Sequence, residues 1–304
     1  MLYLVTFVLM ILDLKDLTAL DKQHYLQHII GPRPICFAST INSEGGVNLS
    51  PFSFFNLFSI HPPIVIFSPS RRLRNSTTKH TLQNILEIPE VVINMVTYDM
   101  VQQTSLASCE YGKEVDEFIK SGFTKEKAIS VSPPMVKESK AKLECKVLEV
   151  KPLGTEGGAG NLVICEVLHM HIDETLLDNG KINQRRLELV ARLGGDWYCK
   201  VSAENLFQVA KPNTQIGIGV DSLPESIRQS KILSGNNLGQ LANVHEVPAV
   251  HPSFDDEHLK NIFQYYSINP AEMEKEVHLY AAKLLSEGKV QEAWQVLLAT
   301  DNIM

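Results

Sequence analysis

Short apolar runs separated by turn-forming residues dominate the first two hundred positions of the chain. Residues 36–41 and 47–50 are two such runs, and the glycine-containing segment between them is typical of a β-hairpin loop. Residues 64–68 and 91–97 are further short runs rich in β-branched residues, which favour strands. These segments predict a series of short strands in the first part of the chain.

Two longer strands are expected after residue 140. The alternating run 143–147 predicts a strand whose polar members Glu144 and Lys146 face water. A glycine-rich turn at 154–160 then leads into residues 162–172, which are apolar enough to predict a strand buried on both faces. Several short strands with glycine turns and few crossover helices favour a mainly β fold, a closed antiparallel barrel rather than a doubly wound parallel sheet.

Helical patterns are sparse in the first part of the chain and concentrated at its end. Short helices are expected at 20–30 and 78–88. Near Asn269 and Pro270 a helix-start signal introduces two amphipathic stripes, which predict two antiparallel helices within 271–300. The stripes are Val277, Tyr280, Ala281, Leu284 and Leu285 before the break at Gly288, and Val290, Ala293, Trp294 and Leu297 after it.

These patterns divide the chain into three predicted parts. Residues 1–203 form the β domain, 204–268 form an extension rich in loop formers that wraps over the surface, and 269–304 form a helical hairpin. Two isolated amphipathic helices would leave their apolar stripes in water. The hairpin is therefore expected to dock on the barrel or on another subunit.

Composition narrows the class of protein. The 304 residues are 44% hydrophobic and 21% charged, as in ordinary globular proteins, and the net charge of -7 argues against a nucleic-acid partner. The five cysteines are odd in number and form no C-x-x-C pair, so they predict reduced core residues of a cytoplasmic protein.

Only the N-terminus invites a membrane interpretation. Residues 1–12 are apolar and uncharged but too few to span a bilayer, and acidic and basic residues follow directly. A short strand, an extension from an upstream start or a packed leader is expected there, without a membrane association.

Polar residues at the ends of apolar runs between residues 31 and 81 predict a lined pocket, because buried hydroxyls need partners. A basic turn follows, with phosphate-binding donors at Ser68, Arg71, Arg72, Lys79 and Thr81. The pattern fits a flat, largely apolar ligand with a phosphate, read as FMN. The alternatives are a polar hairpin with satisfied hydroxyls and a solvated basic turn. Arg33, between two prolines, suits either the phosphate site or a surface ion pair.

The chain resembles the flavin reductase-like family of FMN-binding split-barrel proteins, flavoredoxin-type members in particular. The resemblance rests on Ser39-Thr40, residues 48–55 (NLSPFSFF), 67–69 (FSP), 79–81 (KHT), 191–198 (ARLGGDWY) and segments between 223 and 243. It implies a Greek-key split barrel with FMN at a homodimer interface. The implied cofactor-binding residues are Ser39, Thr40, Asn48, Leu49, Ser50, Ser53, Ser68, Arg72, Lys79 and Thr81; His80 departs from a common aspartate. The helical hairpin after Pro270 is outside the pattern.

The resemblance implies transfer of hydride from NAD(P)H to flavin, with NAD(P)H bound transiently. This step needs no protein acid or base, so no catalytic residue is assigned. The alternatives are an FMN carrier or electron-transfer flavoprotein that acts with a protein partner, and a split barrel that uses haem. His169 and His171 share a strand face but have no evident third metal ligand, and Gly217 and Gly219 lack the context of a dinucleotide site.

Overall fold

The computed structural model describes residues 9–211 and 216–301. The chain divides into two compact units, and the division falls after Phe207. This point lies close to the predicted end of the β domain at residue 203. Each unit is described separately below.

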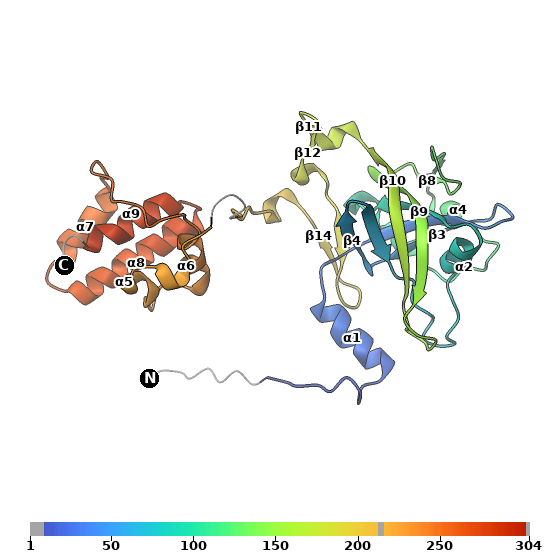
Figure 1. The fold of residues 1–304 in the computed structure, drawn as a ribbon, viewed down its shortest axis with the longest axis horizontal. Coiled ribbons are helices and arrows are strands. Elements are labelled where there is room, and N and C mark those ends of the chain that lie inside the picture. The colour runs from blue at the N-terminus through green and yellow to red at the C-terminus, as the bar shows by residue number, and fades with distance from the viewer. Residues whose placement is uncertain (1–8, 212–215, 302–304) are drawn as a thin grey trace. The chain divides into compact units, whose positions relative to one another are not determined.

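A seven-stranded antiparallel sheet forms the centre of the first unit (Figure 1). Its strands lie in the order β3 (Val47–Phe52), β2 (Cys36–Ile41), β6 (Glu90–Met95), β9 (Ala141–Pro152), β10 (Asn161–Ile172), β5 (Pro63–Phe67) and β4 (Phe55–Ile60). The predicted hairpin is confirmed, because β2 pairs with β3 and places Ser39 opposite Leu49 and Thr40 opposite Asn48. The edge strands β3 and β4 follow each other in the chain, with only two residues between them.

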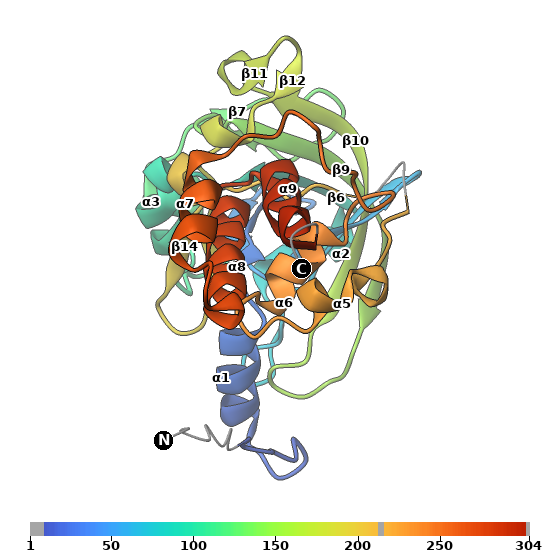
Figure 2. The same ribbon diagram turned by 90° about the vertical axis from the view of Figure 1, so that its left-hand side faces the viewer.

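The long strands β9 and β10 run side by side along the sheet (Figure 2) and correct two predictions. Glu144 does not face water: it is fully buried, and its carboxylate accepts hydrogen bonds from Ile129 N at 2.8 Å and Ser130 N at 2.7 Å. The strand expected to be buried on both faces instead leaves Leu168 and Met170 exposed. In both cases the loops and edges that cover a strand, rather than its own pattern, determine burial.

In the described part of the first unit, four helices accompany the sheet. They are α1 (Ala19–Ile29), α2 (His80–Glu87), α3 (Val101–Leu106) and α4 (Glu117–Ser121), and α1 and α2 correspond to the two predicted helices. Alternate residues of β2 enter different cores. Cys36 and Ala38 pack with Leu82 and Ile85 of α2, whereas Phe37 packs with α4 and its neighbours.

Shorter elements complete the first unit. A three-stranded sheet contains β1 (Arg33–Pro34), β13 (Val190–Arg192) and β14 (Tyr198–Lys200), and two small hairpins pair β7 (Lys125–Glu126) with β8 (Met135–Val136) and β11 (Leu177–Asp178) with β12 (Lys181–Ile182). Short 3₁₀ turns are η1 (Tyr98–Met100), η2 (Glu174–Leu176), η3 (Gln184–Arg186) and η4 (Ala203–Asn205).

Most of the N-terminal segment predicted as a strand or packed leader, residues 1–8, lies outside the described residues. Residues 9–12 have no regular secondary structure, and Leu9 and Ile11 are exposed. Among the residues that the structure describes, no helix is both long and apolar enough to cross a membrane.

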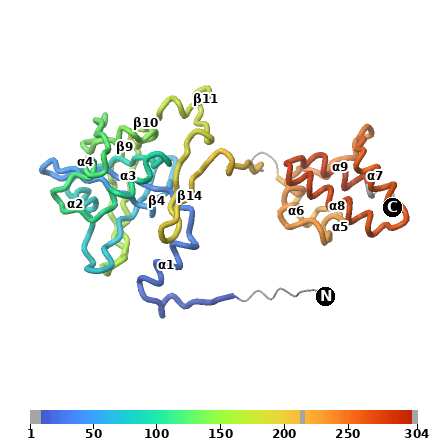
Figure 3. The backbone as a smooth tube through the Cα atoms, turned by 180° about the vertical axis from the view of Figure 1, so that it is seen from behind, coloured from blue at the N-terminus to red at the C-terminus, as the bar shows by residue number. Residues whose placement is uncertain are grey.

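The second unit is a helical bundle with its own apolar core (Figure 3). After η5 (Val220–Ser222) it contains α5 (Glu225–Arg228), α6 (Gly235–Leu241), α7 (Glu257–Tyr265), α8 (Pro270–Ser286) and α9 (Val290–Asp301). The predicted hairpin is confirmed as α8 and α9. Its start is also as expected, since Asn269 caps α8 through Glu272 N at 3.3 Å and Pro270 occupies the first turn.

The segment 204–268 differs from the predicted surface wrapping. Its apolar residues Leu223, Ile227 and Leu241 are buried in the same core as Val277 and Trp294 of the hairpin. The hairpin stripes are therefore covered by the preceding helices. The apolar residues of α5, α6 and α7 are spaced irregularly in the sequence and come together only when these helices pack against α8 and α9. For this reason the sequence of segment 204–268 resembles that of a loop.

Candidate cofactor-binding site

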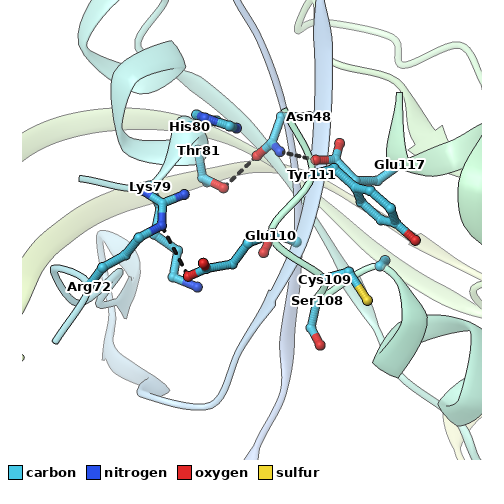
Figure 4. Close-up of a pocket in the computed structure, with 12 residues that line it drawn as sticks. Asn48, Arg72, Lys79, His80, Thr81, Ser108, Cys109, Glu110, Tyr111 and Glu117 are labelled. Carbon is cyan, nitrogen blue, oxygen red and sulfur yellow. Dashed lines mark hydrogen bonds and ion pairs between the residues drawn. The ribbon is translucent and has the colours of Figure 1, made fainter. Parts of the chain in front are cut away.

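A chain of hydrogen bonds joins β3 to the start of α2 and to α4 (Figure 4). The Thr81 hydroxyl donates to Asn48 Oδ1 at 2.6 Å, and Asn48 Nδ2 donates to Glu117 Oε1 at 2.8 Å. The second Glu117 oxygen accepts from Leu49 N at 3.1 Å. The side chains of Asn48 and Thr81 are thus held in fixed orientations at one end of the site.

Glu117 is buried and carries a raised pKa. Burial is the main cause, and the hydrogen bonds from Leu49 N and Asn48 oppose it by favouring the charged form. No local signal in the sequence points to this role, because Glu117 lies 68 residues from Leu49 along the chain. Its side chain braces the strand that carries Asn48 and Ser50.

The basic turn supplies the other end of the site. Arg72 donates through Nη1 to Thr77 Oγ1 at 3.1 Å and to the Thr78 carbonyl at 2.6 Å. Its Nε donates to Glu110 Oε1 at 3.1 Å, and Arg74 pairs with the same carboxylate. Glu110 is the second acidic residue that the sequence did not single out. An acidic residue in a loop is typical of a solvated surface.

Lys79 occupies the N-cap position of α2 and is half-buried. Its side chain makes no capping hydrogen bond, and within residues 9–211 and 216–301 its ammonium group has no hydrogen-bond partner. Burial lowers the pKa of Lys79, as does nearby Arg72, while Glu110 acts in the opposite direction. The pKa of His80 is also lowered, by burial and then by Arg72 and other cations. The start of α2 is therefore a region of positive potential with free donors.

Two adjoining cavities lie at this place. The smaller, of ≈ 20 Å³, is lined by Asn48, Ser50, Arg72, Lys79, His80, Thr81, Glu117 and residues 107–111. The larger, of ≈ 1020 Å³, lies between α1 and residues 70–74 and is also lined by Arg33, Phe54 and residues 156–158. Arg72, Lys79 and Glu110 line both cavities. A narrow polar end thus opens beside a wide space of the size that organic ligands occupy.

The predicted binding residues fall into two groups. Asn48, Ser50, Arg72, Lys79 and Thr81 line the smaller cavity together. The other five lie outside its lining: Ser39, Thr40, Leu49, Ser53 and Ser68. Arg71 of the basic turn lines the larger cavity.

The residues outside the smaller cavity have identifiable surroundings. Ser39, Thr40 and Leu49 are completely buried, and the Thr40 hydroxyl accepts from Asn84 Nδ2 at 3.2 Å. Ser39 Oγ is buried without a hydrogen-bond partner in the described structure. Ser53 Oγ accepts a 3.4 Å hydrogen bond from Arg33 Nε. The alternation of strand side chains explains why neighbours in sequence are separated in this way.

Arg33 forms no ion pair with the described residues, and its side chain lines the larger cavity. It is buried, and its guanidinium donates to carbonyl oxygens of Gln27 at 2.7 Å, of Leu193 at 2.8 Å and of Ile30. Burial lowers its pKa, and the neighbouring Arg192 adds to the effect. Arg33 therefore fastens the end of α1 beside the larger cavity.

The histidine pair on β10 belongs to a separate hydrogen-bond cluster. His169 Nδ1 lies 2.9 Å from the Ser130 hydroxyl, and His171 Nε2 lies 2.6 Å from Glu144 Oε1. In the described part of the chain, no group of three or more His, Cys, Asp and Glu side chains is placed to hold a metal ion.

Comparison with known proteins identifies what the chain is similar to. The model of the flavin reductase like domain matches residues 31–187, more than half of the chain. An uncharacterized protein of Aquifex aeolicus is 36% identical over 177 residues, which are 58% of this chain and 88% of that protein. The helical unit lies beyond the family match.

Two solved structures share the architecture. Nitrilotriacetate monooxygenase component B from Bacillus cereus has a TM-score of 0.63 and 26% identity, covering 67% of this chain and 100% of that chain. A protein with a split barrel domain from Shewanella frigidimarina has a TM-score of 0.56 and 25% identity, covering 65% and 95%. The predicted antiparallel split barrel with a helical C-terminal part is confirmed by this likeness and by the sheet and bundle described above.

Proposed function

The chain belongs to the flavin reductase-like family, and from this premise we propose that it binds FMN and transfers hydride to it from NAD(P)H. The observation that carries the proposal is Lys79: a half-buried cation without a hydrogen-bond partner among the described residues, at an uncapped helix start beside a large cavity. Buried charges are ordinarily paired, so an unpaired ammonium group at this position favours an anionic ligand.

The polar end of the site suits a phosphate. The first-turn amides of α2 have no side-chain cap, and phosphates bind readily to such helix starts. Lys79 supplies a charge-assisted donor, and Arg71 Nε is a further buried donor without a partner in the described structure. Thr81 is less suited than expected, because its hydroxyl already donates to Asn48. We therefore assign the phosphate to Lys79 and the amides of α2.

The wide end of the site suits a flat aromatic ring. Leu26 of α1 and Ile30 directly after it, with Phe54 and Leu73, give the larger cavity apolar lining. Its ≈ 1020 Å³ exceeds what one ring needs. The remaining space would admit a nicotinamide for the time of one transfer. Ser50 and Asn48 line the smaller cavity and would orient the part of the cofactor that joins ring and phosphate.

The protein's contribution to the reaction is binding and orientation. A bound flavin supplies the redox chemistry itself. Glu117 fixes Asn48, which in turn accepts from Thr81, so the polar wall is rigid before a ligand arrives. Arg33 fastens α1 against residue 193 and so maintains the apolar wall. Because the flavin would supply the chemistry and the protein the binding, no catalytic residue is assigned.

A homodimer is also proposed. The edge strand β4 exposes Leu57, Phe58 and Ile60, with 54%, 63% and 77% of their surface accessible. Consecutive exposed apolar residues on a sheet edge favour pairing with another chain. A second copy covering β4 would bury them.

We further propose that the protein works in a reducing compartment such as the cytoplasm. All five cysteines are free, and Cys36, Cys145 and Cys165 are buried. Burial raises the pKa of the Cys145 thiol to about 12, so this group stays protonated and unreactive at neutral pH.

An absorption spectrum and an oxidation assay test the proposal. Protein mixed with FMN and separated from free ligand should retain flavin absorbance. Oxidation of NADH or NADPH should accelerate when FMN is added. Retained flavin without nucleotide oxidation would favour an FMN carrier that acts with a protein partner. A failure to retain or use any flavin would refute the proposal.

A further inference from the structure

Two cations at the polar end of the site are already paired with a carboxylate of the protein, that of Glu110. The Glu110 carboxylate pairs with Arg72 at 3.1 Å (Figure 4) and also with Arg74. Together with Lys79 it lines both cavities. Three cations thus face one carboxylate. This is the charge arrangement expected when a phosphate is bound, but here the negative charge comes from the chain itself.

The space at this end is too small for a phosphate as it stands. The smaller cavity measures ≈ 20 Å³, which is room for about one water molecule. A phosphate that reached Lys79 would also lie close to the Glu110 carboxylate, and two anions repel each other strongly when both are partly removed from water. A ligand phosphate and Glu110 therefore compete for one position.

The contacts of Glu110 allow its carboxylate to move away from Arg72 and Arg74. It lies in the loop between α3 and α4, and within the described residues neither its backbone N–H nor its C=O forms a hydrogen bond. Its anchors are the two ion pairs. The side chain of Glu110 is 40% exposed and that of Arg74 is 71% exposed, so solvent weakens at least one of these pairs.

We propose that Glu110 is a placeholder for the cofactor phosphate, and that FMN binds by exchanging its phosphate for this carboxylate. The inference rests on the proposed function. Because the exchange returns Glu110 to its arginines when FMN departs, it lowers the affinity for FMN and keeps the cofactor exchangeable. FMN would then behave as a substrate that is taken up and released, rather than as a permanently bound group.

The exchange also couples the cofactor to a loop. Glu110 is followed by Tyr111 and, six residues further on, by Glu117, which holds Asn48 and Leu49. Release of Glu110 frees the part of the loop before Asp116, whereas the side-chain cap of Asp116 on Phe118 N at 3.0 Å keeps α4 in place. Movement is thereby confined to the phosphate end of the site.

The test compares Glu110→Gln with the unmodified 304-residue protein by titration with FMN and with riboflavin, which lacks the phosphate. Glu110→Gln keeps the shape of the side chain and removes its charge. We expect FMN to bind about tenfold more tightly to the variant or better, and riboflavin affinity to change less than twofold. Glu114→Gln is the matched control, since Glu114 is an exposed carboxylate in the same loop and lines neither cavity. It should leave both affinities unchanged.

The outcomes separate this inference from the function on which it rests. If wild type and Glu110→Gln bind FMN equally, or if the variant binds FMN less tightly, the placeholder role is wrong while the flavin site stands. If neither protein binds FMN or riboflavin, the proposed function fails and the inference fails with it. A Glu110→Ala variant repeats the measurement should Glu110→Gln unfold at a lower temperature than wild type.

Discussion

The two units of the chain differ sharply in what they bury. Sixteen of the seventeen buried polar or charged residues in the described structure belong to the barrel unit, and only His278 belongs to the helical unit. Burial of a polar group without a partner is costly, so such groups persist where hydrogen bonds satisfy them. In the barrel, Asn48, Thr81 and Glu117 satisfy one another beside the cavities.

The helical unit, in contrast, buries almost exclusively apolar side chains. Its core of leucines, valines and Trp294 is apolar. The buried His278 forms a hydrogen bond through Nδ1 with the Ser230 hydroxyl at 2.8 Å. Stability there comes from packing, whereas the barrel combines packing with a rigid polar wall. The contrast supports the proposal that the barrel unit holds the ligand site. The helical unit calls for a different test.

The largest expected effect is in the helical core. Trp294 is fully buried, and its Nε1 donates to the Leu241 carbonyl at 3.2 Å. We expect Trp294→Ala to destabilise the helical unit by about 3–5 kcal/mol, because truncation of a buried aromatic leaves a cavity. Chemical denaturation followed by circular dichroism measures this loss. FMN affinity should stay unchanged, and Leu279→Ala at a partly exposed position is the control.

If Trp294→Ala abolished FMN binding while the barrel remained folded, the separation of the two units by role would be wrong. The helical unit would then contribute to the flavin site.

An intermediate effect is expected at Glu144 in the barrel. Burial alone would raise the pKa of this carboxyl, but hydrogen bonds from Ile129 N, Ser130 and His171 outweigh burial and lower it to about 2. The folded state therefore binds the proton less readily than the unfolded state. Stability from this group is present above pH 4.5 and is lost as the pH falls toward 2.

Replacement of Glu144 by Gln should lower the free energy of unfolding by about 2 kcal/mol at pH 7, since charge-assisted hydrogen bonds are lost. The difference between wild type and variant should shrink as the pH is lowered from 5 to 3. Urea denaturation at each pH checks this, with Glu149→Gln on the same strand as the control. A difference that is constant with pH would show that the charge of Glu144 is not what stabilises the loop.

The smallest effect on the protomer is expected at the sheet edge. Phe58→Asp should change the stability of one protomer by less than about 0.5 kcal/mol, because Phe58 is exposed on β4. Sedimentation should nevertheless shift from dimer to monomer, since the variant places a charge in the proposed interface. A wild-type protein that sediments as a monomer with flavin bound would contradict the homodimer.

The sequence predicted those elements whose pattern is local. The hairpin of β2 and β3 and the helices α8 and α9 follow from alternation, a glycine turn and the Asn269-Pro270 cap. Helices α5 to α7 were missed because Leu223, Ile227 and Leu241 stand among loop formers and become a core only in three dimensions.

Prediction of the site shows the same limit. Lys79 is predicted as a site residue because a cation before a helix start is a local signal. Glu110 forms a hydrogen bond with Arg72, 38 positions away, and Glu117 forms one with Asn48, 69 positions away. A single sequence contains no sign of such pairings. Glu144 was expected in water because its own strand alternates, while the loop at 129–130 that covers it lies elsewhere in the chain.

The most direct measurement is the affinity of Lys79→Ala for FMN and for riboflavin. Lys79 should contact only the phosphate, so the variant should bind FMN about 10-fold to 100-fold less tightly, as loss of a charge-assisted hydrogen bond implies. Riboflavin affinity should remain within twofold, and Lys127→Ala, which lines neither cavity, should change neither value. Equal losses for FMN and riboflavin, or no loss for either, would contradict the placement of the phosphate at the start of α2.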